Sequence, residues 1–495
     1  MNQSGGRRRN KSARNGRHRR NVSVPGVCPS PKVHPQKADY LLFQLNATQK
    51  ATRNEAAASN ASEDRFSKLP NDLLLNILER VDTLDAIRTS VLSKRMLKLP
   101  TMLSQFFLSI SSIKYDHDKM PQINRAVAHV TDSILGTRNP EITIRNLKIR
   151  FILMDHDSLT IGRSVAHAMA TQKVEAAEFE IITEKAYSDS TPADLLQSAK
   201  LFNNFVGACP DAFAGLRRLW LRNMRFGEQD IPNILSTCKL LESLRLTHCD
   251  SGIYSVLQVE HAQLIELEVD LGKFERVELI CLPKLQRLSR LSLTKVGVHS
   301  DKILELSQLL ADVHSISDLH LDFQSEKIWV LPECPKMLKP VLSKLQHVNL
   351  DNLPEGCDLA WTMFIIEAAP SLKELCITVW DHWCIMMTNK EFRKKYGYCE
   401  KADVKWKLYA PDFKHKTLAK LTIYGFQPND NFKRYIRCVV EHAVNITEIS
   451  LYDRKLCGRC GDKVYQSRYP RTAEERKRTA EGLGLASPAV IHFRS

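Results

Sequence analysis

Two cysteines, Cys457 and Cys460, are separated by two residues, which is the spacing of zinc-binding pairs. A structural zinc ion needs four ligands, and Cys438 and His442 are the neighbours in the sequence that could complete the set. The plainer interpretation is that Cys457 and Cys460 are ordinary thiols in a turn. Because no second pair follows them, we expect no metal ion here.

A second group, Asp318, His320 and Asp322, occupies alternate positions and would lie on one face of a strand. These side chains could hold a metal ion, but the polar face of any sheet needs the same alternation. The nineteen glycines are scattered rather than gathered into a phosphate-binding loop, and no nucleophile elbow is present. We therefore expect no cofactor, no catalytic residue and no enzymatic activity of the chain's own.

The cysteines and the Asp318 group described above must be held in place by strands or helices, and a repeated sequence pattern predicts where the strands lie. The frame L-x-x-L-x-L, in which any aliphatic residue can take an L position, recurs at intervals of 25, 23, 24, 28, 29, 27, 46 and 28 residues. All but one of these intervals lie at or near the period of leucine-rich repeats, about 20–29 residues. Each frame predicts a short strand whose aliphatic side chains point into the core. The frames begin at Leu216, Leu241, Leu264, Leu288, Ile316, Leu345, Leu372, Leu418 and Ile446.

The pattern predicts an α/β fold with an irregular leucine-rich-repeat solenoid over residues 140–456. The solenoid is irregular because the asparagine or cysteine that normally follows each frame occurs only as Cys249. The longest interval carries an insertion, residues 380–415, which is rich in aromatic and basic side chains. This insertion is either an extra helix that covers the solenoid edge or a binding loop. We expect a helical linker over residues 105–139 and a C-terminal tail over residues 457–495.

The polar positions of each frame should line the concave face of the sheet, because side chains alternate along a strand. These positions are basic at the start of the array and acidic in its middle. We hypothesise that a protein target binds there, acidic where it meets the first group and basic where it meets the second. The alternative is an ordinary soluble surface. The candidate target-binding residues are Arg218, Trp220, Arg222, Arg245, Glu266, Glu268, Asp270, Asp318 and Asp322.

Residues 1–60 carry 12 lysines and arginines against two acids, Asp39 and Glu55, so they hold most of the net charge of +15. This composition is typical of a disordered basic tail. The tail is either a solvated segment, a nuclear-import signal or a weak contact for nucleic acid. We do not expect nucleic acid as a partner, because no aromatic side chain precedes Tyr40 to stack on bases.

The thirteen cysteines and the basic start, which lacks a signal-peptide pattern, favour a reducing compartment. We therefore expect the protein in the nucleus, the cytoplasm or both. No apolar run reaches the roughly 18 residues that a membrane span needs, so we expect no membrane partner.

Residues 61–104 contain the pattern of three short helices. In the first, which starts at Pro70, apolar side chains recur at helical spacing from Leu73 to Val81. The second starts at Thr83 as N-cap, and the third ends before Pro100. Helices this short cannot bury their apolar faces alone, so the plain interpretation of this pattern is the N-terminal cap of a larger domain.

These residues resemble the F-box in the form common in large plant families. The resemblance is carried by Leu69-Pro70, Asp72-Leu73-Leu74, Ile77-Leu78, Val81, Asp85-Ala86 and the run from Val91 to Arg95. Met96 and Pro100 stand where the family usually has tryptophans. The segments GFQPNDNFKRYIR and SRYPRTAEERK resemble the FBD-like ending of plant F-box proteins with divergent leucine-rich repeats.

The resemblance implies a three-helix F-box followed by the solenoid, in the substrate-recognition subunit of a Skp-cullin-F-box ubiquitin ligase. The F-box would dock on a Skp-type adaptor and, through it, on cullin, while the solenoid holds the target. The alternative is a leucine-rich interaction scaffold with a degenerate F-box, which Met96 and Pro100 favour. The expected adaptor-binding residues are Leu69, Pro70, Leu73, Leu74, Ile77, Leu78, Val91 and Leu92.

Overall fold

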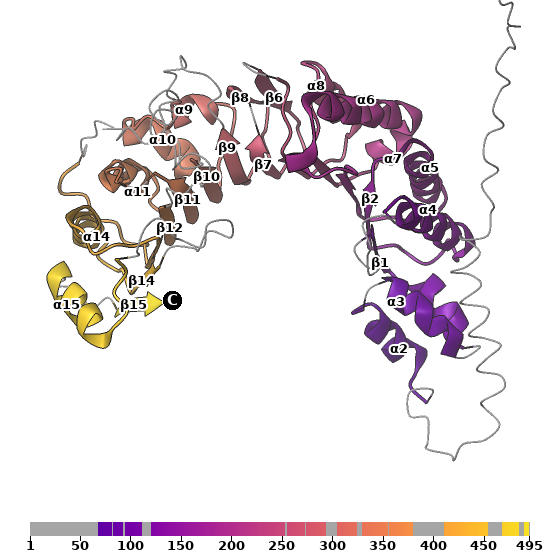
Figure 1. Ribbon diagram of the computed structural model, residues 1–495, viewed down its shortest axis with the longest axis horizontal. Coiled ribbons are helices and arrows are strands. Elements are labelled where there is room, and N and C mark those ends of the chain that lie inside the picture. Colours follow the sequence, from indigo (N-terminus) through magenta and orange to yellow (C-terminus); the bar gives the residue numbers. More distant parts are fainter. Residues whose placement is uncertain are drawn as a thin grey trace, which may run out of the picture.

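The fold is organised by one continuous sheet of 13 parallel strands, in the order β1-β2-β3-β4-β5-β7-β9-β10-β11-β12-β13-β14-β15. Figure 1 shows that the sheet curves, with its strands on the inner side and the helices α4 to α14 on the outer side. The computed structural model describes residues 68–81, 83–92, 95–110, 120–252, 255–272, 274–293, 304–323, 329–354, 356–379, 410–453, 468–484 and 490–494. The predicted α/β class is confirmed.

The strands of the main sheet are short. They are β1 (Gln105–Ser109), β2 (Asn146–Ile152), β3 (Ala177–Ile182), β4 (Arg218–Arg222), β5 (Ser243–Thr247), β7 (Glu266–Gly272), β9 (Arg287–Leu293), β10 (Asp318–Asp322), β11 (His347–Leu353), β12 (Glu374–Val379), β13 (Lys420–Tyr424), β14 (Glu448–Tyr452) and β15 (Val490–Arg494). A separate pair is formed by β6 (Val256–Glu260) and β8 (Arg276–Ile280).

The helices connect successive strands. They are α4 (Met120–Thr137), α5 (Asp155–Thr171), α6 (Pro192–Ala208), α7 (Pro210–Ala214), α8 (Asp230–Thr237), α9 (Leu306–Leu309), α10 (Pro335–Leu342), α11 (Met363–Ala368), α14 (Asp430–His442) and α15 (Ala473–Leu483), with the 3-10 turns η5 (Tyr187–Asp189) and η6 (Leu359–Thr362).

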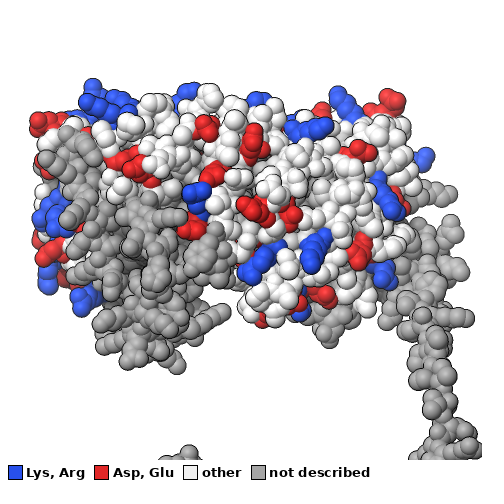
Figure 2. All heavy atoms as spheres, turned by 90° about the horizontal axis from the view of Figure 1, so that it is seen from above, with Lys and Arg blue, Asp and Glu red and all other residues white. Residues whose placement is uncertain are grey.

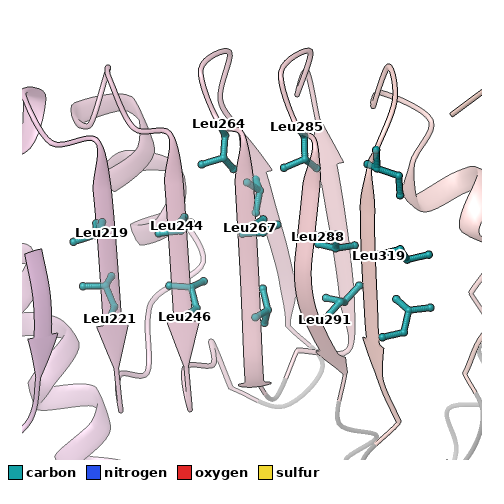
Figure 3. Close-up of a cluster of buried hydrophobic side chains, with 14 of the residues drawn as sticks. Leu219, Leu221, Leu244, Leu246, Leu264, Leu267, Leu285, Leu288, Leu291 and Leu319 are labelled. Atoms are coloured by element: carbon teal, nitrogen blue, oxygen red, sulfur yellow. The ribbon is translucent and has the colours of Figure 1, made fainter. Parts of the chain in front are cut away.

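The aliphatic residues of the repeat frames form the core. Leu219, Leu244, Leu267 and Leu288 follow one another across β4, β5, β7 and β9, and all are buried (Figure 3). Each buried leucine contributes about 1.5–3 kcal/mol relative to an exposed one. The repetition of the frame therefore dictates both the strands and their register.

One frame is displaced from its predicted position. Leu288 is paired with Leu267, the second aliphatic residue of its own frame, so Leu285 is the first residue of the β9 repeat. The register then shifts, and Leu291 rather than Arg290 pairs with Val269. This β-bulge inserts one residue, which a search for a fixed spacing cannot register.

The sheet extends beyond the predicted limits of 140 and 456 at both ends. Residues 105–139, expected as a helical linker, contribute β1, which pairs with β2, and α4, which packs beside them. Residues 457–495, expected as a tail, contribute α15 and β15, which pairs with β14. The basic tail over 1–60 and most of the predicted insertion, residues 380–409, lie outside the described residues.

Residues 68–102 form α2 (Asn71–Leu78), α3 (Thr83–Arg88), η1 (Thr89–Leu92) and η2 (Met96–Met102). The third predicted helix is therefore a 3-10 segment, and Pro100 lies inside it instead of ending it. The proline removes one N–H donor here as it would in an α-helix, but its carbonyl oxygen still accepts a hydrogen bond from the Leu103 N–H at 3.4 Å.

These N-terminal elements attach to the first strand of the sheet. The Thr83 hydroxyl accepts a hydrogen bond from the Phe107 N–H at 2.7 Å. The Glu79 carboxylate accepts hydrogen bonds from the Ser104 N–H at 2.9 Å and from the Arg145 guanidinium at 3.2 Å. Residues 68–102 thus sit at the β1 edge of the sheet, held by polar contacts from two of their helices.

A glycine in the loop after β13 gives a direct test of this packing. Gly425 has φ +76°, and a Cβ there would overlap the carbonyl oxygen of Val379. We expect Gly425→Ala to cost about 1–2 kcal/mol for the left-handed backbone and about 1–3 kcal/mol more for the displaced neighbour. Gly252, with φ +93° and open space around its Cβ position, is the matched control that should cost only the first amount. Urea unfolding of both variants checks the difference, and equal losses would contradict it.

Candidate protein-binding surfaces

The first candidate surface lies on the N-terminal helices. Leu73 is 52% exposed, Ile77 39%, Val81 46% and Leu92 67%, and Pro70 beside them is exposed as well. We call these five residues the F-box face. Leu73 and Ile77 lie four residues apart in α2 and so occupy one side of that helix. Apolar residues so exposed in a short module are typical of a surface that a partner covers.

Not all of the predicted adaptor-binding residues belong to this face. Leu74 and Leu78 are buried, and they face the core formed with η2. Leu69 is half-buried, and its carbonyl accepts a hydrogen bond from Arg95 at 2.5 Å. The side chain of Val91 is outside the described part of the chain. Adjacent helical residues point about 100° apart, so one face of α2 cannot hold Leu73 and Leu74 together.

Met96 and Pro100, the two departures from the family pattern, are both buried. They therefore belong to the core of this module rather than to the F-box face. A methionine and a proline in place of tryptophans therefore change the packing of this core. Leu73 and Ile77 are exposed on the outside of the module and are not part of that packing.

The second candidate surface is the inner face of the sheet. Along β4 the burial alternates, with Leu219 and Leu221 buried and Arg218, Trp220 and Arg222 on the opposite side. The same alternation holds for Arg245 on β5, for Glu266 and Glu268 on β7 and for Asp318 on β10. These residues, with the partly exposed Asp270, are brought together as predicted. Asp322 is the exception.

Asp322 is fully buried, so it cannot contact a target directly. One carboxylate oxygen accepts a hydrogen bond from the Arg290 guanidinium at 2.8 Å, and the other accepts one from the Asn352 amide at 2.9 Å. The expectation that Asp322 binds a target is wrong, because neighbouring strands contribute partners that cover it.

Arg290, on β9, is the centre of an ion-pair network on the inner face. Its guanidinium lies 3.1 Å from Asp270, 2.8 Å from Asp322 and 4.0 Å from Asp351, which come from β7, β10 and β11. Burial alone would lower the pKa of Arg290, but the charges of Asp322 and Asp270 outweigh it and raise the pKa. One arginine thus joins four strands. No role for Arg290 was expected from the sequence.

Histidines extend the same network. His320 contacts the Asp351 carboxylate at 2.8 Å, and His347 contacts Asp318 at 2.8 Å. Burial alone would raise the pKa of Asp351, but the hydrogen bonds from His320 and Thr378 and the charge of Arg290 together lower it. The acids in the middle of the inner face therefore have partners within the protein, although Asp270, Asp322 and Asp351 share the single cation of Arg290.

The glutamates of β7 are paired in the same way. Arg245 lies 3.1 Å from Glu268, and Arg287 lies 3.4 Å from Glu266. Burial raises the pKa of Glu268 despite the charge of Arg245. For Glu266, burial acts in the same direction, but the hydrogen bond from Ser289 and the charges of Arg287 and Arg245 outweigh it and lower the pKa.

Two basic residues on the inner face were not recognised from the sequence. Lys148 and Arg150, on β2, face the same side as Arg218 and form ion pairs with Glu178 at 2.7 Å and Glu180 at 3.1 Å. Burial raises the pKa of Glu180. Both lie at alternate positions after Ile144, which correspond to the polar positions of the repeat frames.

The predicted metal candidates do not come together in the described part of the chain. Asp318, His320 and Asp322 contact three different partners, His347, Asp351 and Arg290. Among the described residues, no group of three metal-ligating side chains converges. Cys457 and Cys460 lie outside those residues. No helix in the described ranges is long and apolar enough to cross a bilayer.

The contribution of Asp351 to the stability of the sheet should depend on pH. Because the folded-state pKa of Asp351 is lowered, its stabilising contribution is present above the unfolded pKa of about 3.9 and is lost as the pH falls through the folded value. Asp351→Asn should therefore cost about 1.5–3 kcal/mol near pH 7, and the difference from wild type should shrink below about pH 4. The exposed Asp412→Asn is the control, with an expected cost below about 0.5 kcal/mol. Urea unfolding of wild type and both variants from pH 7 to below about pH 4 tests this prediction. A difference between Asp351→Asn and wild type that does not change with pH would refute it.

Comparisons with known proteins bear on both surfaces. Residues 66–107 match the family profile of the F-box domain, and residues 164–305 match that of the FBD-associated F-box protein At5g56370, LRR repeats. The first match covers α2 to β1, and the second covers strands β3 to β9 of the sheet.

Several Arabidopsis thaliana proteins are similar over longer stretches. The putative FBD-associated F-box protein At5g22720 is 27% identical over 64% of this chain and 68% of its own length. The F-box/FBD/LRR-repeat protein At5g56420 is 28% identical over 46% of this chain and 54% of its own length. The putative F-box/FBD/LRR-repeat protein At5g22610 is 25% identical over 42% of this chain and 42% of its own length. The matched stretches thus cover between 42% and 68% of the length of these relatives. It contains an F-box and FBD-associated leucine-rich repeats, and its homologues are F-box/FBD/LRR-repeat proteins of Arabidopsis thaliana.

Proposed function

We propose that the chain is the substrate-recognition subunit of a Skp-cullin-F-box ubiquitin ligase. The observation that carries this proposal is the F-box face, on which Leu73, Ile77 and Leu92 remain exposed in a region that matches the F-box family. An adaptor of the Skp type would cover these side chains, and burying them would stabilise the complex. Cullin would then join through the adaptor.

The attachment of the F-box to the sheet supports this role. Arg138 is buried, and its guanidinium donates hydrogen bonds to the carbonyl oxygens of Leu103 at 3.0 Å and Ile142 at 2.8 Å. Together with the contacts of Glu79 and Thr83, these bonds set the orientation of the F-box relative to the first repeats. A target on the inner face of an irregular leucine-rich-repeat solenoid would therefore be held at a defined distance from the adaptor.

In this role the chain needs no catalytic residue of its own. Its contribution is proximity, because holding a target near the charged ubiquitin-conjugating enzyme raises the effective concentration of the target's lysines. The inner face, with Arg218, Trp220, Arg222 and Arg245 at its start, is the surface that we propose for the target.

Co-expression with a Skp-type adaptor and cullin tests the proposal. We expect the three proteins to elute together in size-exclusion chromatography, and the isolated cullin not to bind without the adaptor. If the chain captures a protein target but never retains the adaptor, the alternative of a leucine-rich scaffold with a degenerate F-box is correct.

We also propose that the basic residues 7–20 direct the protein to the nucleus. Deleting them should move a fluorescently tagged copy from the nucleus to the cytoplasm without changing its thermal stability, because they are separate from the sheet in the sequence. Microscopy of the deletion and of a control in which the same arginines become lysines checks this. An unchanged distribution of the deletion would contradict a role in import.

A further inference from the structure

We infer that the inner face of strands β2 to β5 binds a carboxylate-rich segment of the target protein, centred on Trp220. This inference rests on the proposed function and names the chemistry of the partner that the inner face would take. We call Lys148, Arg150, Arg218, Trp220, Arg222 and Arg245 the Trp220 patch.

The first argument is the charge left over after internal pairing. On the inner face of β2 to β4, four basic side chains face two acidic ones, Glu178 and Glu180, and both acids are already paired with Lys148 and Arg150. Arg218 reaches Glu178 only at 3.8 Å and is 60% exposed. No ion pair to Arg222 occurs within the described residues, and its Nε is buried without a hydrogen bond. The exposed Arg218 is thus available to an incoming carboxylate, and the partly exposed Arg222 would break no ion pair with a described residue in binding one.

The second argument is the geometry around Trp220. The guanidinium carbons of Arg222 and Arg245 lie 5.6 Å from the centre of the Trp220 ring, one from the same strand and one from β5. The indole N–H donates to the Thr247 hydroxyl at 2.9 Å, which fixes the ring. Arg245 is already paired with Glu268, so Arg222 beside the held ring is the group that can donate a charge-assisted hydrogen bond to a glutamate or aspartate of the target.

A basic segment of the target would meet acids that already have partners within the protein. The middle of the inner face holds more acids than bases, and Asp270, Asp322 and Asp351 share the cation of Arg290, while Arg287, His320 and His347 contact Glu266, Asp351 and Asp318. A lysine of the target would have to displace these contacts. On the helical side, seen from above in Figure 2, acidic and basic residues are interspersed. The excess of basic side chains on β2 to β4 therefore favours an acidic segment at the Trp220 patch.

The test uses the full chain and a fluorescein-labelled oligoglutamate of about ten residues, long enough to cross four strands that lie about 4.8 Å apart. Fluorescence anisotropy should show binding at about 50 mM salt that weakens at about 300 mM, and weaker binding of oligolysine. Arg222→Gln should reduce the affinity about tenfold, because it removes a charge-assisted hydrogen bond. Arg276→Gln, an exposed arginine on β8, is the matched control and should change the affinity less than twofold.

The inference is wrong if oligoglutamate does not bind, if Arg222→Gln behaves like Arg276→Gln, or if oligolysine binds more tightly. A phosphoserine peptide that binds while oligoglutamate does not would also overturn it. Adaptor binding is measured on the same preparations. Retained adaptor binding without oligoglutamate binding refutes the Trp220 patch alone, whereas the reverse refutes the proposed ligase role alone.

Discussion

Replacing Leu73 and Ile77 together by aspartate should abolish binding to a Skp-type adaptor. Both side chains are exposed in the free protein, so the aspartates cost little in the fold. In the complex they would place two carboxylates in an apolar interface, at several kcal/mol each. The affinity should therefore fall below detection in a pull-down with the recombinant adaptor.

The matched control is Leu240→Asp, which replaces a leucine that is 49% exposed in the turn between α8 and β5. This variant should bind the adaptor like wild type. Thermal unfolding of both variants should stay within about 2–4 °C of wild type, because no buried contact is lost. Adaptor binding by the double variant with wild-type affinity would show that the F-box face is not the docking surface.

The second large effect concerns the sheet. Arg290→Met should lower the free energy of unfolding by about 3 kcal/mol, because it leaves the buried Asp322 and its neighbours Asp270 and Asp351 without their shared cation. The loss should be smaller at low pH, because the carboxylates then take up protons and no longer repel one another. Urea unfolding of wild type and Arg290→Met at neutral and at low pH measures this loss of stability.

Two further variants make this test specific. Arg276→Met removes an exposed partner of Glu278 and should cost less than about 1 kcal/mol. Adding Asp322→Asn to Arg290→Met removes one of the stranded charges and should restore part of the stability. If Arg290→Met costs no more than Arg276→Met, the network does not stabilise the sheet.

The sequence predicted the strands well where the frame was repeated. Nine recurrences of the aliphatic alternation gave β4 to β14 of the main sheet, because buried strands need apolar side chains at every second position. The ends were missed. The sequence of β15, from Val490 to Arg494, occurs once and lacks a leucine frame, and β1 precedes the predicted start of the array at residue 140.

The bulge in β9 was beyond prediction for a different reason. Its inserted residue keeps the apolar character of Leu288 and Leu291 and changes only the spacing. Where several leucines lie close together, several frames fit the letters equally well. The register of the neighbouring strands decides among them, and that information is tertiary.

For the two surfaces, the sequence predicted which strands and helices carry them but not the contacts between their side chains. Period-2 alternation correctly placed Arg218, Trp220 and Glu268 on the inner face. It could not show that Arg290 reaches three carboxylates, since those contacts join strands far apart in the sequence. In α2, the adjacent apolar residues Leu73 and Leu74 point in different directions, and only packing decides which stays exposed.

The most direct test of the central claim is hydrogen–deuterium exchange of the full chain with and without a Skp-type adaptor. We predict slower exchange of backbone amides in residues 70–92 in the complex, and unchanged exchange in β4 and β5, which carry Trp220 and Arg245. Protection confined to the N-terminal helices would place the adaptor on the F-box face and leave the inner face of the sheet open for a target. A complex that leaves residues 70–92 unprotected, or no complex at all, would contradict the assignment of this chain as a ligase subunit.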